Sequence, residues 1–164
     1  MKEILDLKQE LLEGNFPEAL RLTTELETMA RQDKVNALEN FLALLVSRLI
    51  VIQVMDDIYQ SYINDIRNSL IEIQQRNRLG NRFYIKAQDW RPHYESTLPY
   101  AILIAVETTE LIEGTDVEQL RETINYELLR ADTFKLIRLT YSMDAYEIDR
   151  YLRSLWSNRQ TYLY

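Results

Sequence analysis

Hydrophobic positions recur every three or four residues along most of the chain, which is the spacing of one face of an α-helix. This pattern predicts a first helix over residues 2–13, which ends at Gly14. A second helix is predicted over 17–32, with Pro17 in its first turn. The third predicted helix, over 34–55, is apolar over most of its circumference, which is typical of a helix at the centre of a bundle.

The same periodicity continues to the end of the chain. We expect further helices over residues 56–78, 98–113, 116–130, 133–141 and 144–158. No run of alternating polar and apolar residues is long enough for a substantial strand, and no Ser-, Gly- or Pro-rich linker divides the chain. The sequence therefore predicts an all-α, single-domain helical bundle of six to eight helices over residues 1–164. Helix 34–55 should lie at its centre, and a tail over 159–164 is either loose or docked on the body.

Composition supports the helical prediction and removes several kinds of chemistry. Only three glycines and three prolines occur in 164 residues, which disfavours turn-rich β folds. The chain has no cysteine, which excludes disulfides, thiol catalysis and zinc sites with thiolate ligands. Its single histidine, His93, excludes sites that need a pair of histidines, such as di-iron bundle centres. We therefore expect no cofactor.

Charge is unevenly distributed along the chain. The net charge is −7, with one basic and eight acidic residues over 92–129, but six basic and four acidic residues over 130–164. Binding of duplex nucleic acid requires a dense basic face, and neither of these two stretches of the chain provides one. We therefore expect no duplex nucleic-acid partner, and a protein partner or a second copy of the chain instead.

The most apolar run, residues 41–55, carries Arg48 near its centre. A membrane-spanning helix needs about 20 apolar residues, so this run predicts a buried core helix. The first residues are charged and lack the apolar stretch of a signal peptide. We therefore expect a cytoplasmic protein without a membrane contact.

Residues 12–53 carry a pattern of glycine, alanine, glutamate and leucine that continues more sparsely toward residue 110. The matching positions are Glu13, Gly14, Phe16, Ala37, Leu38, Glu39, Leu42, Leu49, Tyr62, Ile66, Ile73, Pro99, Ala101 and Ala105. In these positions the chain resembles a divergent member of the helical family called domain of unknown function twenty-nine, which is common in cyanobacteria. The resemblance covers about residues 12–110 and leaves a C-terminal helical extension over 116–158. It implies a helical fold and no established activity, and Arg48 stands where the family has histidine.

Two groups of residues are candidates for catalysis. His93 lies close to Ser96 and Thr97, but only Glu95 is at hand to orient it, so an exposed or helix-capping histidine is the preferred interpretation. Clustered carboxylates indicate an alternative function, a magnesium-dependent hydrolase of the helical nucleotide pyrophosphatase type. The metal-ligand candidates for that alternative are Glu107, Glu110, Glu113 and Asp116.

The C-terminal residues combine tyrosine and arginine, which are both favoured at protein interfaces. The candidate interface residues are Tyr146, Arg150, Tyr151, Arg153, Tyr162 and Tyr164. Half-buried tyrosines at the edge of a bundle, or stacking on single-stranded RNA, would give the same composition. With no catalytic residues identified, the sequence favours a non-enzymatic interaction or regulatory module that self-associates or acts as an adaptor.

Arg48 is a cation on an apolar stripe of the predicted central helix. An unpaired guanidinium in a core is costly, so we expect Arg48 either to reach water or to meet a carboxylate from another helix. The candidate partners are Glu25, Glu27 and the acidic residues of 107–118. The pair would be a helix-packing contact or the polar floor of a small pocket.

Overall fold

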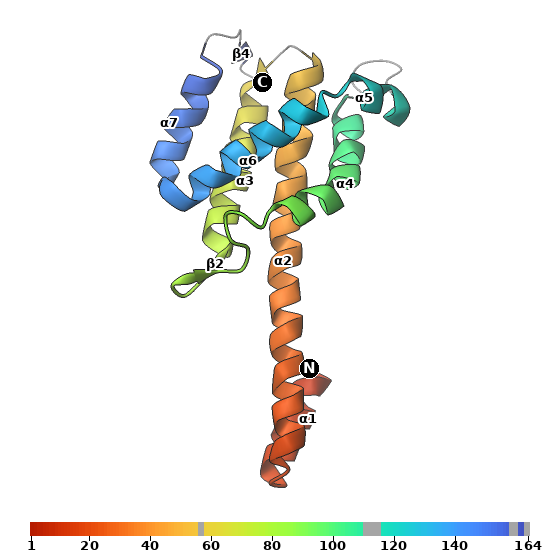
Figure 1. Ribbon diagram of the computed structural model, residues 1–164, viewed down its shortest axis with the longest axis vertical. Coiled ribbons are helices and arrows are strands. Elements are labelled where there is room, and N and C mark those ends of the chain that lie inside the picture. The colour runs from red at the N-terminus through yellow and green to blue at the C-terminus, as the bar shows by residue number, and fades with distance from the viewer. Residues whose placement is uncertain (56–57, 110–115, 158–160, 163–164) are drawn as a thin grey trace. The chain divides into compact units, whose positions relative to one another are not determined.

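The computed structural model describes residues 1–55, 58–109, 116–157 and 161–162. These residues form seven helices, shown in Figure 1. The helices are α1 (Lys2–Leu12), α2 (Phe16–Met55), α3 (Gln60–Arg76), α4 (Arg91–Thr109), α5 (Val117–Thr123), α6 (Tyr126–Ser142) and α7 (Ala145–Leu155). The prediction of an all-α bundle with six to eight helices is confirmed.

Strand structure in the described residues is limited to four segments of two residues each. β1 (Ile58–Tyr59) pairs in parallel with β4 (Thr161–Tyr162). β2 (Arg78–Leu79) pairs antiparallel with β3 (Arg82–Phe83). Gly80 lies in the turn between β2 and β3 with a φ of 61°, a value that glycine adopts without steric cost.

Two predicted breaks between helices were wrong. The break expected at Asp33 is absent, because α2 continues through it and Gln32 donates a hydrogen bond to Asn36 across the position, at 2.8 Å. The break expected near residue 131 lies earlier, at Ile124, whose extended backbone ends α5. Asn125 then caps α6 by accepting a hydrogen bond from the Leu128 amide.

Pro99 lies inside α4, so this helix starts before the predicted range 98–113. α4 begins at Arg91, with Pro92 in its first turn, where a missing N–H costs nothing. Pro99 is exposed, so water can satisfy the carbonyl group that its missing amide leaves free. The described part of this helix ends at Thr109.

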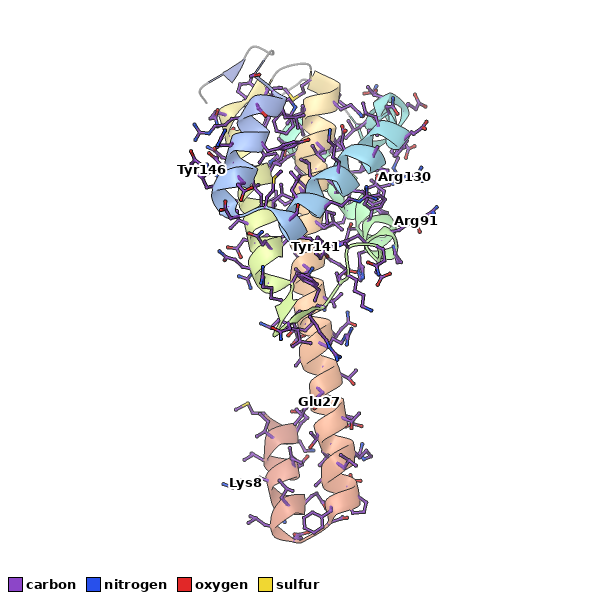
Figure 2. The ribbon with its side chains drawn as sticks, turned by 60° about the vertical axis from the view of Figure 1, so that its left-hand side comes forward. Lys8, Glu27, Arg91, Arg130, Tyr141 and Tyr146 are labelled. Atoms are coloured by element: carbon purple, nitrogen blue, oxygen red, sulfur yellow. The ribbon has the colours of Figure 1, made fainter. Side chains whose placement is uncertain are left out.

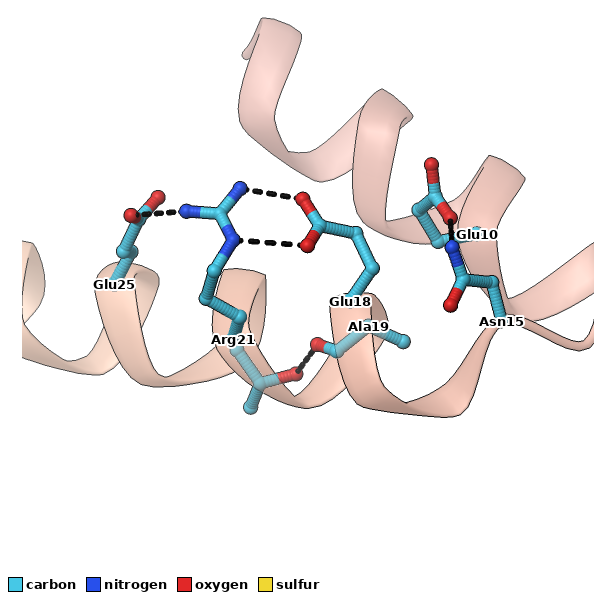
Figure 3. Close-up of polar contacts among 7 residues, drawn as sticks. Glu10, Asn15, Glu18, Ala19, Arg21 and Glu25 are labelled. Atoms are coloured by element: carbon cyan, nitrogen blue, oxygen red, sulfur yellow. Dashed lines mark hydrogen bonds and ion pairs between the residues drawn. The ribbon is translucent and has the colours of Figure 1, made fainter.

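The described chain divides into two compact units, Met1–Asn36 and Ala37–Tyr164. In the first unit, Gly14 and Asn15 turn the chain between α1 and α2, and the Asn15 amide bonds the Glu10 carbonyl at 2.9 Å. Only Ala19 and Leu22 are buried among the apolar residues of this unit. Its polar contacts are shown in Figure 3, where Arg21 bridges Glu18 and Glu25.

The second unit holds the hydrophobic core. α2 contributes a dense run of buried residues, α3 packs against α6 and α7, and α4 packs against α5. The largest fully buried side chains are Trp90, Leu38, Leu42, Leu45, Ile50, Ile58, Ile66, Leu70, Ile73, Leu120, Leu129 and Leu136. Part of α2 is long and apolar enough to cross a membrane by length and composition alone, and 56% of that stretch is buried inside the protein.

A buried polar network anchors the segment between α3 and α4. The side chain of Asn77 bonds both backbone groups of Ile85, each at 2.9 Å, and donates to the Tyr141 hydroxyl at 2.9 Å. That hydroxyl also accepts from Trp90 Nε1 at 2.6 Å and donates to the Ile85 carbonyl at 2.6 Å. These bonds hold the chain around Ile85 against α6. Because each polar group satisfies another, the loss of one side chain would leave a buried partner without a hydrogen bond.

Candidate functional site

The predicted interface residues of α7 lie around an open groove. Asp144 caps the helix by accepting from the Glu147 amide at 2.8 Å, and Ile148 and Leu152 are buried on its inner face. The outer face carries Tyr146, labelled in Figure 2. The groove has a volume of about 590 Å³ and is lined by Met143, Glu147, Arg150, Tyr151, Arg153 and Ser154.

Cations and aromatic rings pair around this groove. The Arg150 guanidinium carbon lies 5.8 Å from the centre of the Tyr146 ring, and the Lys135 ammonium lies 5.9 Å from the Tyr151 ring. Such contacts hold a cation against an apolar surface while its charge still faces water. The groove can therefore offer both flat apolar contact and positive charge.

Asp149 is an acidic residue of α7 whose charge is compensated. Its carboxylate pairs with Arg67 of α3 at 3.1 Å and with Arg153 at 2.9 Å. In the part of the chain that the structure describes, no carboxylate pairs with Arg150. Arg150 thus remains available to a partner's acidic group.

The structure brings four of the six predicted interface residues together on α7, namely Tyr146, Arg150, Tyr151 and Arg153. Tyr162 has its backbone in β4, and its side chain is outside the described residues. Tyr164 also lies outside the described residues. Met143, Glu147 and Ser154 complete the lining of the groove, and sequence reasoning missed them because none of these residue types signals an interface.

Arg48 is a largely buried cation with two hydrogen-bond partners. Its Nε donates to Asp65 of α3 at 2.7 Å, and its Nη1 donates to the Thr108 hydroxyl of α4 at 2.8 Å. Its guanidinium also lies 5.7 Å from the Tyr62 ring. The partner is a carboxylate from another helix, but the named candidates were wrong: the pairing residue is Asp65, and Glu25 pairs with Arg21.

His93 does not form a catalytic group with its neighbours. Its Nδ1 lies 2.8 Å from the Glu39 carboxylate of α2, and the ring is only about a quarter exposed. The Ser96 and Thr97 hydroxyls both donate to the His93 backbone carbonyl, as side chains of a helix commonly do. The expectation of an exposed or capping histidine was wrong, because the ring is partly buried and contacts Glu39. The sequence did not indicate this partner, since it lies 54 residues away.

The carboxylates proposed as metal ligands are only partly described. Glu107 is an exposed residue of α4, and Asp116 is the N-cap of α5, where its side chain accepts from the Gln119 amide at 2.8 Å. Glu110 and Glu113 lie outside the described residues. Among the residues that are described, no group of three or more acidic or histidine side chains could hold a metal ion.

A second cavity contains a carboxylate that the sequence did not single out. It has a volume of about 240 Å³ and is lined by Leu49, Ile52, Gln53, Leu128, Leu129, Asp132 and Trp156. Burial raises the pKa of Asp132, and the nearby Lys135 opposes the rise. The Gln53 amide is occupied, because it exchanges hydrogen bonds with the Asn125 backbone at 2.9 and 3.2 Å. This pocket holds one acidic group in apolar surroundings and no second group for catalysis.

Comparison with models of protein families, with curated proteins and with solved structures gives no match to this chain. The resemblance to the helical family therefore stays a prediction from the sequence, and the geometry of the described residues carries the functional argument.

Proposed function

We propose that this protein is a non-enzymatic, adaptor-like interaction module, and that the α7 groove binds an acidic segment of a partner protein. The observation that carries the proposal is Arg150, a cation stacked on Tyr146 at the edge of an open groove without a carboxylate partner in the described residues. Arginine and tyrosine dominate binding energy at protein interfaces because they combine broad apolar contact with polar groups.

The charge balance supports an acidic partner. Lys135, Arg150 and Arg153 gather around the groove, whereas Glu147 is the acidic residue of its lining. Complementary charge speeds association and selects partners more than it adds affinity, while Met143 and Tyr151 supply apolar contact. A cytoplasmic location is part of the proposal, as the sequence analysis expects.

The proposal is tested with two fluorescein-labelled helical peptides of equal length, one of alternating leucine and glutamate blocks and one with lysine in place of glutamate. Fluorescence anisotropy on the full chain should show binding of the acidic peptide alone. The Arg150→Glu/Arg153→Glu variant should weaken that binding by about tenfold or more. Lys86→Glu, an exposed charge reversal outside the groove lining, is the matched control and should leave binding unchanged.

Three results would contradict the proposal. Equal binding of both peptides would show that charge does not select the partner. Unchanged affinity in the double variant would place binding elsewhere on the molecule. Displacement of the acidic peptide by a single-stranded oligonucleotide, with tighter binding of the oligonucleotide, would favour the nucleic-acid interpretation.

A further inference from the structure

The N-terminal unit, Met1–Asn36, exposes an unusual amount of apolar surface for its size. Six large apolar side chains on α1 and the first turns of α2 are between 48% and 79% exposed. They are Ile4, Leu5, Leu11, Leu12, Phe16 and Leu20. No residue of α1 is buried, so this helix has almost no core of its own.

Helical spacing places most of these side chains on one side of the hairpin, which we call the hairpin face. Ile4 and Leu11 are seven residues apart on α1, and Phe16 and Leu20 are four apart on α2, so each pair follows one flank of its helix. In an antiparallel helix pair, neighbouring flanks of the two helices together form one side of the pair. The flank of α1 with Ile4 and Leu11 and the flank of α2 with Phe16 and Leu20 form such a side. Leu5 and Leu12 extend the apolar surface around the outer edge of α1.

The opposite side of the hairpin is charged. Figure 3 shows its contacts: Arg21 pairs with Glu18 and Glu25, and Asn15 donates to Glu10. A hairpin with one charged side and one apolar side has the pattern of a surface helix pair that packs its apolar side against something else. Nothing within Met1–Asn36 covers the hairpin face, since its residues remain exposed.

Size and area indicate that the hairpin needs a partner. Units shorter than about 40 residues usually require oligomerisation, a metal or disulfides for stability, and this one has 36 residues and no cysteine. A stable protein interface buries roughly 800 Å² per partner, and six large apolar side chains that are about half or more exposed supply much of such an area. Pairing two such hairpins builds a four-helix bundle, in which every helix buries one face.

Charge argues for a second copy as the partner. The unit has five basic and eight acidic residues, and the flank of α2 that bears Phe16 and Leu20 continues with Glu27, Arg31 and Lys34 at helical spacing. This flank therefore carries charges of both signs, which two identical surfaces related by a twofold axis can pair with each other. A lipid surface fits less well, because the unit is acidic and contains neither tryptophan nor tyrosine.

We propose that the hairpin face pairs with the hairpin face of a second copy of this chain, so that two Met1–Asn36 units form a four-helix bundle. This surface is distinct from the α7 groove, and its role does not depend on the function proposed for that groove. The chain would then present two α7 grooves in one dimer.

The test measures the mass of the full chain by sedimentation equilibrium over a range of concentrations. The expected mass is twice the 19.6 kDa of one chain. The Phe16→Glu/Leu20→Glu variant should dissociate to monomers, with a dimer affinity at least about a hundredfold weaker. The Met29→Glu/Leu103→Glu variant is the control: it exchanges two apolar side chains that are about half exposed and lie outside the hairpin face, and it should remain dimeric.

A second measurement does not depend on a glutamate variant. Because the chain has no cysteine, Leu20→Cys gives a single thiol on the hairpin face and Met29→Cys gives one on the other side of α2. Maleimide should label Leu20→Cys slowly at high protein concentration and faster after dilution, whereas Met29→Cys should label at one rate throughout.

The proposal is overturned if the wild-type chain is monomeric at all concentrations, or if the Phe16→Glu/Leu20→Glu variant stays dimeric. A monomeric wild type that binds vesicles of neutral phosphatidylcholine would also overturn it, in favour of a lipid surface. The Arg150→Glu/Arg153→Glu variant should remain dimeric, so failure of groove binding and failure of dimerisation are separate results.

Discussion

Replacing Asn77 by alanine should lower the free energy of unfolding by about 3 kcal/mol. Asn77 is only 2% exposed, and its side chain makes three hydrogen bonds of 2.9 Å each. The Ile85 carbonyl keeps its bond from Tyr141, but the Ile85 amide loses its only side-chain acceptor. An unsatisfied buried donor costs roughly 1–3 kcal/mol, and each further lost bond roughly 0.5–1.5 kcal/mol, which gives the expected total.

Urea unfolding followed by tryptophan fluorescence measures this cost, because Trp90 belongs to the same network. Gln75→Ala is the control: Gln75 is exposed in the last turn of α3, two residues before Asn77, and its replacement should change stability by less than about 0.5 kcal/mol. Tyr141→Phe should also destabilise, and the double variant should lose less than the sum of the two single variants because they share a bond. An Asn77→Ala cost below about 1 kcal/mol, or full additivity with Tyr141→Phe, would refute the network as a stabilising unit.

Three further predictions concern buried or partly buried charge and hydroxyl groups. The side chains of Arg48 and Asp65 are 17% and 37% exposed. A double-mutant cycle with Arg48→Ala and Asp65→Asn should therefore give a coupling energy of about 1 kcal/mol. A coupling energy of zero would refute the contribution of this pair to stability. The Tyr94 hydroxyl is buried without a hydrogen-bond partner in the described residues, so Tyr94→Phe should leave stability equal or higher by up to about 1 kcal/mol. Burial raises the pKa of Tyr94 to about 12, so the wild type should lose stability between about pH 10 and pH 12, and thermal unfolding of Tyr94→Phe should show a smaller loss. Because the pKa of Asp132 is raised, Asp132→Asn should be more stable than the wild type at pH 7 by chemical denaturation, and the difference should vanish in acid below the ordinary carboxyl pKa of about 4.

The helical class was predictable because the periodicity of apolar positions is a property of each segment alone. Helix ends were harder to predict. Asp33 and Asn125 are both residue types that can cap a helix, and its surroundings decide whether each of them does so. Asp33 is exposed inside α2, where a poor helix former costs only a fraction of a kcal/mol, about 0.5. Asn125 is held by Gln53 of α2, a contact that no local pattern reveals.

The candidate site was predictable in composition and not in its contacts. Tyrosine and arginine at helical spacing placed Tyr146, Arg150 and Arg153 on α7. Arg48 was identified as a cation that needs a partner, but Asp65 lies 17 residues away on another helix. Pairing between helices depends on how they pack, which the sequence of one helix does not determine.

The distribution of aromatic residues has a consequence for spectroscopy. Both tryptophans and all eleven tyrosines belong to the unit Ala37–Tyr164, and Trp90 and Trp156 are each less than a tenth exposed. Intrinsic fluorescence and tyrosine absorbance therefore report on this unit alone, whereas far-ultraviolet circular dichroism reports on both. If the Met1–Asn36 unit melts first, the dichroism will change at a lower temperature than the fluorescence, so each unit can be followed separately in one unlabelled chain.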